Sequence, residues 1–576
     1  MYIKNLILYS ALSLQTSLFS YPIEDWLQTI QYHELVNDFA SACATANSAL
    51  MEYPDEKALY RQRIMSYASA GLESDALKEW QLYLKHFGED WADTQLLEKL
   101  AWCVLQQGIT NPAPLTRLVA LSGACATRDM KAYPHLEKAF RDPCAVIRCA
   151  ACQAAAQLRR NEFAPLLLSL AEFDQSSPVR IGALEALANL KESKTKSLIL
   201  RKIAQGDISY EERISMAKVL AILEEKSPLK CFQLLINSKD SSFRCLAVEY
   251  AIYTRLPESY TPIIALLDDP QIELQVASLH ALAILWPAWP CTPETVQKIR
   301  QKAQSTDDTV AVSASWILSL CSSKEGLGQL ETFLHHPNPQ IRYLAVAAIC
   351  ASGSKAIPLL KYILKTNAEL NIKLNAAMGL VRLRTNIPEA CTIIERSLRN
   401  EDERFGQKKW GALKAIVDGR TEKNELLSPD LMDLATRLEV INLLAIVKAP
   451  CVPNLLTRFI QSRVWGASGI ASMLLLTEGD DSAIEIVEEI LQQARTPYLR
   501  LQAALVLAMW GKNAAAIEPL LQAYPGAGKE TKERIIAALA AIGEQESIPF
   551  LANTLLEPGP SLRVQAASAL LQVIYR

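Results

Sequence analysis

Residues 336–364 decide the fold of this chain, and they read HPNPQIRYLAVAAICASGSKAIPLLKYIL. Apolar side chains from Ile341 to Ile349 are spaced by three or four residues, which predicts an amphipathic helix. Gly353 can take the positive φ that ends a helix. Pro358 suits the first turn of a second helix, where its missing N–H is not needed. The stretch therefore predicts a helix, a tight turn and a second helix.

An arginine followed three residues later by a small residue recurs along the chain at intervals of about 32 residues. A helix pair of this length cannot bury both of its faces alone, so successive pairs have to stack. We therefore predict an all-α fold, an α-α superhelix of about fourteen helix pairs. The arginines of the clear copies are Arg148, Arg180, Arg244, Arg342, Arg500, Arg534 and Arg563.

An acidic residue stands six positions before several of the arginines, in the turn that precedes the helix. Such an acid can accept hydrogen bonds from the free N–H groups at the helix start. The arginine can reach the acid of its own unit or of the next one. We predict a structural ladder between repeats, and a ligand-binding role is the less favoured alternative. The predicted acid–arginine pairs are Asp142 with Arg148, Asp174 with Arg180, Asp207 with Arg213, and Glu557 with Arg563.

These features resemble a known repeat family. The turn, the Val/Ile-Arg pair, the helix of small residues, the glycine and the Ile-Pro-Leu-Leu helix are similar to the HEAT repeat of the short type named after phycobiliprotein (PBS) lyases. The resemblance covers residues 115–576 and implies a HEAT/armadillo-like solenoid. It implies no single function, because the family includes scaffolds, transport receptors and a few enzymes.

The front of the chain follows a different pattern. Residues 57–90 read as two helices around a turn at Gly71, and they resemble a tetratricopeptide (TPR) unit. Residues 24–50 resemble a less regular copy. We therefore expect a TPR-like helical segment over residues 21–110, docked as the N-terminal end of the HEAT array.

Residues 1–20 carry a basic Lys4 and a short apolar core over 6–14, which predicts a signal peptide and an exported protein, periplasmic or secreted. The alternative is a buried N-terminal helix of a cytoplasmic protein. The 13 cysteines favour that alternative, because their spacing shows no disulfide framework. The stretch is too short and too polar for a secure membrane span.

Composition and motifs argue against most chemistry. The net charge is −3 and no basic stripe is present, which disfavours a nucleic-acid partner. Six histidines are few for metal or general-base chemistry. Cys144, Cys149 and Cys152 lack an evident fourth ligand, so we expect them to pack in the core. We predict no metal, no cofactor and no catalytic residue.

The favoured function is therefore a non-enzymatic scaffold that binds a protein through a concave solenoid groove. The alternative is a HEAT-like enzyme or ligand-binding protein, similar to a bilin lyase or a DNA glycosylase, with a pocket on the groove. The glycosylase interpretation requires a basic groove in which a Trp meets an Asp. The predicted partner contacts are the aromatic residues Trp286, Trp289, Trp316, Tyr343 and Trp410.

Two places in the array break its pattern. Residues 286–291 hold two tryptophans among prolines, and this loop either anchors a partner or fills a gap between misfitted repeats. The last repeat stops after one helix without a polar capping helix, although solenoid ends normally carry one. This end is therefore expected to be covered by a partner or by another copy of the chain, which would make an oligomer.

Overall fold

The computed structural model describes residues 21–88, 91–206, 208–289, 291–398, 484–509 and 514–576, with 437, 440–441 and 443–455. Within these ranges every regular element is a helix, which confirms the all-α prediction. The predicted signal peptide at residues 1–20 lies outside the described ranges, as do Asp207 and Trp410. The chain divides into two compact units, residues 1–139 with 511–576, and residues 140–510. We call these unit 1 and unit 2.

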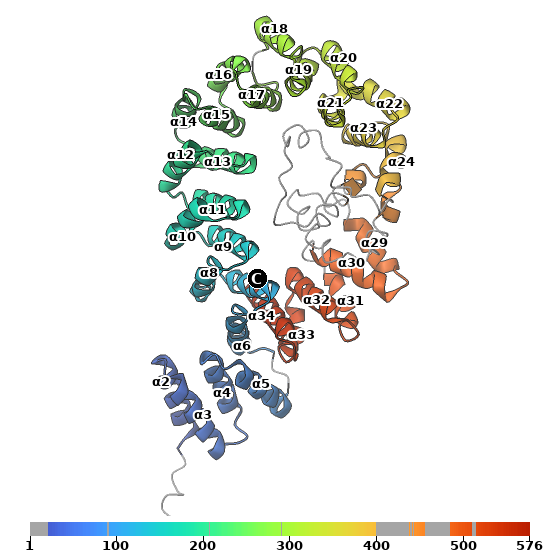
Figure 1. Cartoon of the computed structure of the whole chain (residues 1–576). Coiled ribbons are helices and arrows are strands. Elements are labelled where there is room, and N and C mark those ends of the chain that lie inside the picture. Colours follow the sequence, from blue (N-terminus) through green and yellow to red (C-terminus); the bar gives the residue numbers. More distant parts are fainter. Residues whose placement is uncertain are drawn as a thin grey trace, which may run out of the picture. The chain divides into compact units, whose positions relative to one another are not determined.

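Unit 2 is a stack of helix pairs in two layers. The first helix of each pair packs against the first helix of the next pair. In Figure 1 these first helices lie on the inner side of the curve of unit 2 and the second helices lie on the outer side. The inner layer comprises α9(Ala145–Leu158), α11(Ser177–Asn189), α13(Tyr210–Leu223), α15(Ser241–Thr254), α17(Ile272–Ile284), α19(Asp308–Cys321), α21(Pro339–Ala351) and α23(Leu370–Arg382).

The outer layer covers the opposite side of each inner helix. Its described helices are α10(Ala164–Phe173), α12(Lys194–Gln205), α14(Pro228–Ile236), α16(Tyr260–Ala265), α18(Pro293–Lys302), α20(Ser323–Phe333), α22(Ile357–Thr366) and α24(Ile387–Leu398). Unit 2 also contains α29(Ile484–Gln493) and α30(Pro497–Met509).

The stretch that decides the fold forms α21, a turn and α22. Gly353 takes a φ of +75° in the turn, and Pro358 lies in the first turn of α22. The repeated alanine suits the packing of neighbouring inner helices, because a larger side chain would push the helices apart. It is fully buried at Ala151, Ala183 and Ala345. The predicted helix–turn–helix repeat is therefore confirmed at the level of single residues.

Unit 1 joins the two ends of the chain. Its N-terminal part comprises α2(Ile23–Leu35), α3(Phe39–Glu52), α4(Lys57–Ser69), α5(Glu73–Phe87), α6(Thr94–Gly108), α7(Pro114–Ala126) and α8(Tyr133–Ala139). Its C-terminal part comprises α31(Ile517–Ala523), α32(Lys529–Ile542), α33(Ile548–Thr554) and α34(Pro560–Ile574). The helix pair α4 and α5, with Gly71 at a φ of +72° between them, occupies the segment predicted to be TPR-like.

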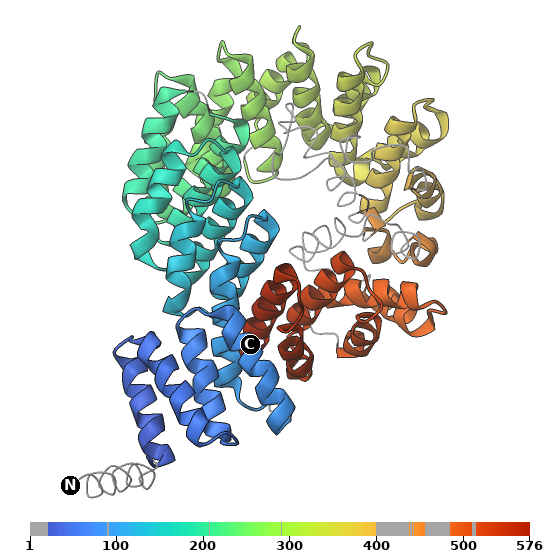
Figure 2. The ribbon, with the colours of Figure 1, turned by 60° about the horizontal axis from the view of Figure 1, so that its bottom comes forward.

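The C-terminal helix is not left uncapped. α34 packs against α6 and α7, so the dark red end of the chain lies against blue helices in Figure 2. The contact with α7 is close, because a Cβ added at Gly123 would come within 2.6 Å of Ser568 Cα. The prediction that this end needs a partner or a second copy is therefore corrected: helices of the same chain cover it. The compact units divide at 139/140 and 510/511.

Candidate functional site

Most of the ladder arginines hold two successive repeats together, and Arg148 shows how. Its Nε and Nη2 donate to the two carboxylate oxygens of Asp174 in the next repeat, at 2.7 and 2.9 Å. Its Nη1 donates to the backbone carbonyl oxygens of Asp142 and Pro143 in its own turn, at 2.8 and 3.2 Å. The acid side chain comes from the next unit, and the unit of the arginine itself supplies main-chain oxygens.

The turn acids have the second role expected of them. Asp142 Oδ1 accepts from Cys144 N at 2.8 Å and Asp174 Oδ1 accepts from Ser176 N at 2.9 Å, which satisfies free N–H groups near the helix start. Burial opposes ionisation of Asp174, but the hydrogen bonds from Arg148 and Ser176 outweigh it, and its pKa is lowered. The carboxylate is therefore ionised and fixed in place.

The same arrangement continues along unit 2 with acids from two kinds of position. Asp269 and Glu369 stand at or next to the turn before their helix, whereas Glu212 and Glu249 lie inside helices α13 and α15. The sequence pattern of acids in turns could not find the last two. The ion pairs are Arg180–Glu212 at 2.6 Å, Arg213–Glu249 at 2.9 Å, Arg244–Asp269 at 2.9 Å and Arg342–Glu369 at 2.7 Å.

One predicted ladder residue in the C-terminal repeats is misplaced. Arg534 pairs with Glu530 one turn earlier in its own helix, and Ala537, three residues after it, is exposed. The ladder position in this helix belongs to Lys532, whose Nζ lies 3.0 Å from Glu557 Oε1. α32 is thus rotated about its axis relative to the orientation that the sequence repeat predicts. Glu557 binds Lys532 of the preceding repeat through its carboxylate and Arg563 of its own repeat through its carbonyl oxygen.

Three further arginines make ladder contacts, which we call rungs: Arg563 in the last repeat, Arg117 and Arg500. Arg563 pairs with Glu73 of α5 at 2.7 Å, so the N-terminal segment supplies the acid that a following repeat would carry. Its Nη1 also donates to the Glu557 carbonyl oxygen at 3.1 Å. Arg117, which sequence analysis missed, donates to the carbonyl oxygens of Asn111 and Pro112 in the same manner. Arg500 donates to the Ala494 carbonyl oxygen at 3.3 Å.

The ladder lapses in the middle of unit 2. Gln275 takes the arginine position in α17, where its Nε2 donates to the Asp269 carbonyl oxygen at 2.7 Å. Ala311 takes that position in α19 and is buried. The Trp-Pro loop lengthens the connection between these two helices. The inner layer therefore has no arginine rung at two consecutive repeats.

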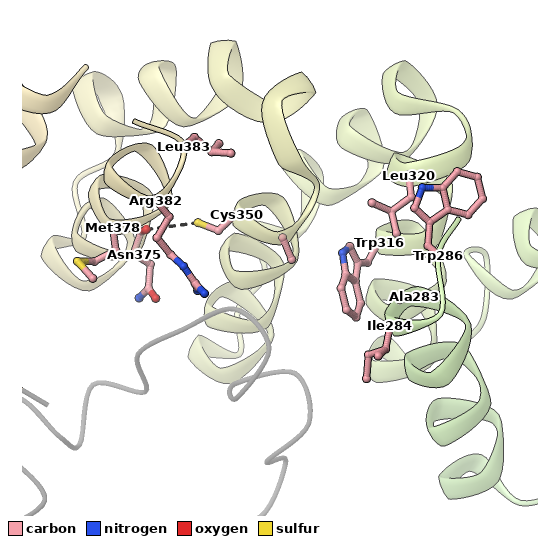
Figure 3. A pocket seen from close by; sticks show the side chains of 12 residues that line it. Ala283, Ile284, Trp286, Trp316, Leu320, Cys350, Asn375, Met378, Arg382 and Leu383 are labelled. Atoms are coloured by element: carbon pink, nitrogen blue, oxygen red, sulfur yellow. Dashed lines mark hydrogen bonds between the residues drawn. The ribbon is translucent and has the colours of Figure 1, made fainter. Parts of the chain in front are cut away.

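A pocket of about 460 Å³ lies at this lapse. It is formed by the C-terminal halves of α17, α19, α21 and α23 and by the start of the Trp-Pro loop (Figure 3). Its walls are mostly apolar, and its polar atoms come from few side chains. The lining residues are Ala283, Ile284, Trp286, Trp316, Leu320, Cys350, Ala351, Asn375, Met378, Gly379, Arg382 and Leu383.

The predicted aromatic contacts divide into pocket and packing residues. Trp286 and Trp316 line the pocket. Trp289 is 2% exposed, stacks edge-on against Trp286 and donates from Nε1 to the Leu282 carbonyl oxygen at 2.7 Å, so it fills a gap and offers no surface to a partner. Tyr343 is half-buried outside the pocket, with its hydroxyl near Asn371. Trp410 lies outside the described residues.

Two hydrogen-bond donors in the pocket have no acceptor among the described residues. Trp316 is 3% exposed, yet no described atom accepts from its Nε1. Arg382 is exposed and forms no ion pair or hydrogen bond with the described part of the chain. In Figure 3 the guanidinium of Arg382 and the indole of Trp316 stand on opposite sides of an open space. Sequence analysis did not single out Arg382, because it is outside the repeat register.

The remaining polar groups of the pocket are neutral and internally bonded. Cys350 Sγ donates to the Asn375 carbonyl oxygen at 3.3 Å, and Asn375 Nδ2 donates to the Asn371 carbonyl oxygen at 2.9 Å. Burial raises the pKa of Cys350 to about 12, although the nearby Arg382 acts to lower it. The thiol is therefore protonated at neutral pH. The lining contains tryptophans and an arginine but no aspartate, so the arrangement expected of a DNA glycosylase is not found here.

The cysteines that could have bound a metal pack between repeats instead. Cys152 is fully buried, and Cys149 Sγ lies 3.8 Å from the Pro178 carbonyl oxygen, which fits packing between repeats. Among the described residues no group of His, Cys, Asp and Glu could hold a metal ion. In the same part of the chain, no helix combines the length and the apolar character needed to cross a bilayer.

Comparison with known proteins supports the repeat assignment. The family model described as HEAT repeats matches residues 104–188, 133–221 and 479–571. No curated protein matches the chain in sequence.

Three solved structures show a distant likeness. The karyopherin Kap121p bound to the SUMO protease Ulp1p is 12% identical with a TM-score of 0.38, covering 96% of this chain and 73% of that one. The myosin chaperone UNC-45 from C. elegans is 11% identical with a TM-score of 0.31, covering 92% and 79%. The CpcE–CpcF complex of phycocyanin lyase from Nostoc is 16% identical with a TM-score of 0.19, covering 52% and 92%. Likenesses of this size concern the fold alone.

Between the matched segments, α15 and α21 carry the same buried alanine and an arginine paired with an acid of the next repeat. The chain is therefore an α-solenoid with HEAT repeats over residues 104–221 and 479–571.

Proposed function

We propose that this protein is a non-enzymatic scaffold that binds a protein partner on the inner helix layer of unit 2. The pocket at the lapse of the ladder is the observation that carries the proposal. Elsewhere in the layer, the arginines and acids satisfy each other between repeats. At the pocket, four successive inner helices present apolar side chains together with two donors for which the described part of the chain offers no acceptor.

The composition of the pocket fits protein recognition. Tryptophan and arginine are enriched among the side chains that contribute most to binding between proteins. Trp286, Trp316 and Arg382 come from three different elements and meet at one place. Met378 adds a flexible apolar side chain, which adapts to the shape of a partner.

Site-specific photocrosslinking tests the proposal. We would place p-benzoylphenylalanine at Met378 in the pocket and, as the matched control, at Tyr362 on the outer helix α22, where the side chain is 56% exposed. Irradiation in the native cells should join a discrete protein to the Met378 variant and not to the Tyr362 variant. Equal crosslinking at both positions, or none at Met378, would contradict the proposal.

The same purified protein separates the scaffold from the alternative of an enzyme or ligand-binding protein. Native mass spectrometry of the full chain from its own cells would reveal a bound small molecule as added mass. Such a mass, lost on substitution of Trp316 and accompanied by no protein crosslink at Met378, would favour the alternative. A pocket of about 460 Å³ lies within the range of small-molecule sites, so the measurement is a fair one.

A further inference from the structure

Resting on the proposed function, we infer that the pocket receives an aromatic or large aliphatic side chain of the partner that has a carboxylate next to it in the sequence. The occupant is thus an acidic–aromatic peptide motif. Four features carry this inference: the volume and apolar walls of the pocket, the N–H of Trp316 and the guanidinium of Arg382, neither of which has a partner among the described residues, and the absence of acids from the lining.

The apolar part of the motif follows from the walls. Ile284, Leu320, Met378 and the faces of Trp286 and Trp316 enclose about 460 Å³. That space exceeds one aromatic side chain and leaves room for the adjoining backbone. Burying an aromatic ring there removes apolar surface on both partners from water, which is the main driving force for such contacts.

The acceptor part of the motif follows from Trp316. A buried tryptophan N–H normally finds a hydrogen-bond partner, and each exception in a native structure needs a reason. The ring is held in place by His280, whose imidazole meets it edge-on with the centroids 6.3 Å apart. Nε1 is a buried donor with no described acceptor, and a carbonyl or carboxylate oxygen of a partner would satisfy it if the indole turns to expose Nε1 to the pocket.

The negative charge of the motif follows from Arg382. This residue ends α23, where a basic side chain often bonds to the last carbonyl groups of its helix. Those groups are already occupied: the carbonyl oxygens of Gly379, Leu380 and Val381 accept from backbone N–H groups of Leu383, Thr385 and Arg384. The guanidinium is thus available for an anion, and its planar donor set suits a carboxylate.

Two cations act on thiols at or near the pocket. Arg382 acts on the Cys350 thiol, and Lys355 acts on the Cys321 thiol one turn beyond Trp316; both cations lower the pKa values that burial raises. The lining residues themselves include no acid. A basic peptide would therefore meet like charge, whereas an acidic one would be attracted.

Peptide binding to the full-length protein tests the inference. The probes are the capped tripeptides Ac-Glu-Phe-Gly-NH2, Ac-Gln-Phe-Gly-NH2 and Ac-Glu-Ala-Gly-NH2, measured by calorimetry and saturation-transfer NMR. We expect the first to bind, the second to bind about fivefold to tenfold more weakly because it lacks the charge, and the third to bind below detection. Equal affinity of the first two, or no binding of the first, would overturn the inference.

Variants assign the effect to the two donors. Arg382→Gln should remove the preference for the glutamate peptide over the glutamine peptide, and Trp316→Phe should weaken both while keeping the ring. Arg384→Gln is the matched control, because it removes an exposed arginine two positions away that does not line the pocket. If the Arg382→Gln variant still preferred the glutamate peptide, Arg382 would not be the residue that recognises the carboxylate.

The two proposals can fail separately. Loss of peptide binding with the Met378 crosslink intact would mean that the partner uses this surface through other chemistry. Loss of the crosslink with peptide binding intact would mean that the pocket is real but the scaffold proposal is wrong.

Discussion

Two stretches of the same inner layer are built from the same repeat and behave differently. From α9 to α15, successive helices are joined by arginine–acid pairs, such as Arg148 with Asp174 and Arg180 with Glu212. From α17 to α23, the arginine position holds Gln275, then the buried Ala311, and the ladder resumes only with Arg342. The pocket lies in the second stretch.

This difference indicates that one stretch of the layer stabilises the fold and the other is available to bind a partner. In the ladder stretch, each charge meets an opposite charge and main-chain oxygens of the same protein, so little binding capacity is left for a partner. In the pocket stretch, Trp316 Nε1 and Arg382 have no acceptor among the described residues. The donors that the fold does not use are the ones available for binding.

Removing one ladder arginine should have the largest effect. Glu212 is 1% exposed, so Arg180→Ala leaves a buried carboxylate without its ionic partner. We expect a loss of about 3–5 kcal/mol in the stability of this stretch. Chemical denaturation followed by circular dichroism, with hydrogen exchange of α11 and α13, would measure it. The same position in the pocket stretch should matter less, with Gln275→Ala costing about 1 kcal/mol, because only one neutral hydrogen bond is lost.

Two controls make the ladder experiment specific. Arg201→Ala removes a solvent-exposed pair with Glu172 and should cost less than about 1 kcal/mol. The double variant Arg180→Ala/Glu212→Ala should be more stable than Arg180→Ala alone, since no charge is left buried. A comparable loss for Arg201→Ala and Arg180→Ala would contradict the distinction between the two kinds of pair.

Acid should loosen the pocket stretch before the ladder stretch. Burial lowers the pKa of His280 from 6.5 to about 4. Between these values the unfolded chain binds a proton that the folded chain does not, so stability falls as the pH drops from 6.5 to 4 and levels off below. The free energy of unfolding falls by about 3 kcal/mol in total over this pH range. The lowered pKa of Asp174 keeps the Arg148 pair intact until the pH falls below 3.8.

Hydrogen exchange at a series of pH values, corrected for the intrinsic exchange rate, resolves the two stretches. Protection in α17 and α19 should decline between pH 6.5 and 4 while protection in α9 and α11 persists. His280→Phe keeps the ring contact with Trp316 and should abolish the decline. A decline of equal size in both stretches, or one unaffected by the substitution, would show that His280 is not its source.

Sequence reasoning found the repeat and the ladder because both are local and periodic. The 32-residue spacing of the arginines, the alanine three residues later and the proline in the second helix are all visible in the chain itself. The direction of the ladder was left open, because spacing alone does not distinguish an acid of the same unit from one in the next. Glu212 and Glu249 were missed since they lie inside helices and not in turns.

The closure of unit 1 and the pocket depend on packing between distant residues. Arg563 and Glu73 are 490 residues apart in sequence, and small residues such as Gly123 and Ser568 occur in every repeat, so no local signal pairs them. Trp316 was identified as an aromatic candidate, but Arg382 carries no sequence signal beyond its charge. Only the stacking of α19, α21 and α23 brings the two side chains to the same space.

The smallest effect should come from restoring a rung. Asp307 is the N-cap residue of α19, the position that Glu369 holds in α23, where it pairs with Arg342 at 2.7 Å. Gln275→Arg should therefore reach Asp307 as Arg342 reaches Glu369, and should stabilise α17 and α19 by about 0.5–1 kcal/mol. Hydrogen exchange of these helices would measure the gain, which should vanish in the double variant Gln275→Arg/Asp307→Asn. Gln275 does not line the pocket, so binding of the glutamate peptide should stay unchanged. If the new rung instead weakened peptide binding, the lapse itself would be part of the recognition surface, and stability and binding would be coupled at this site.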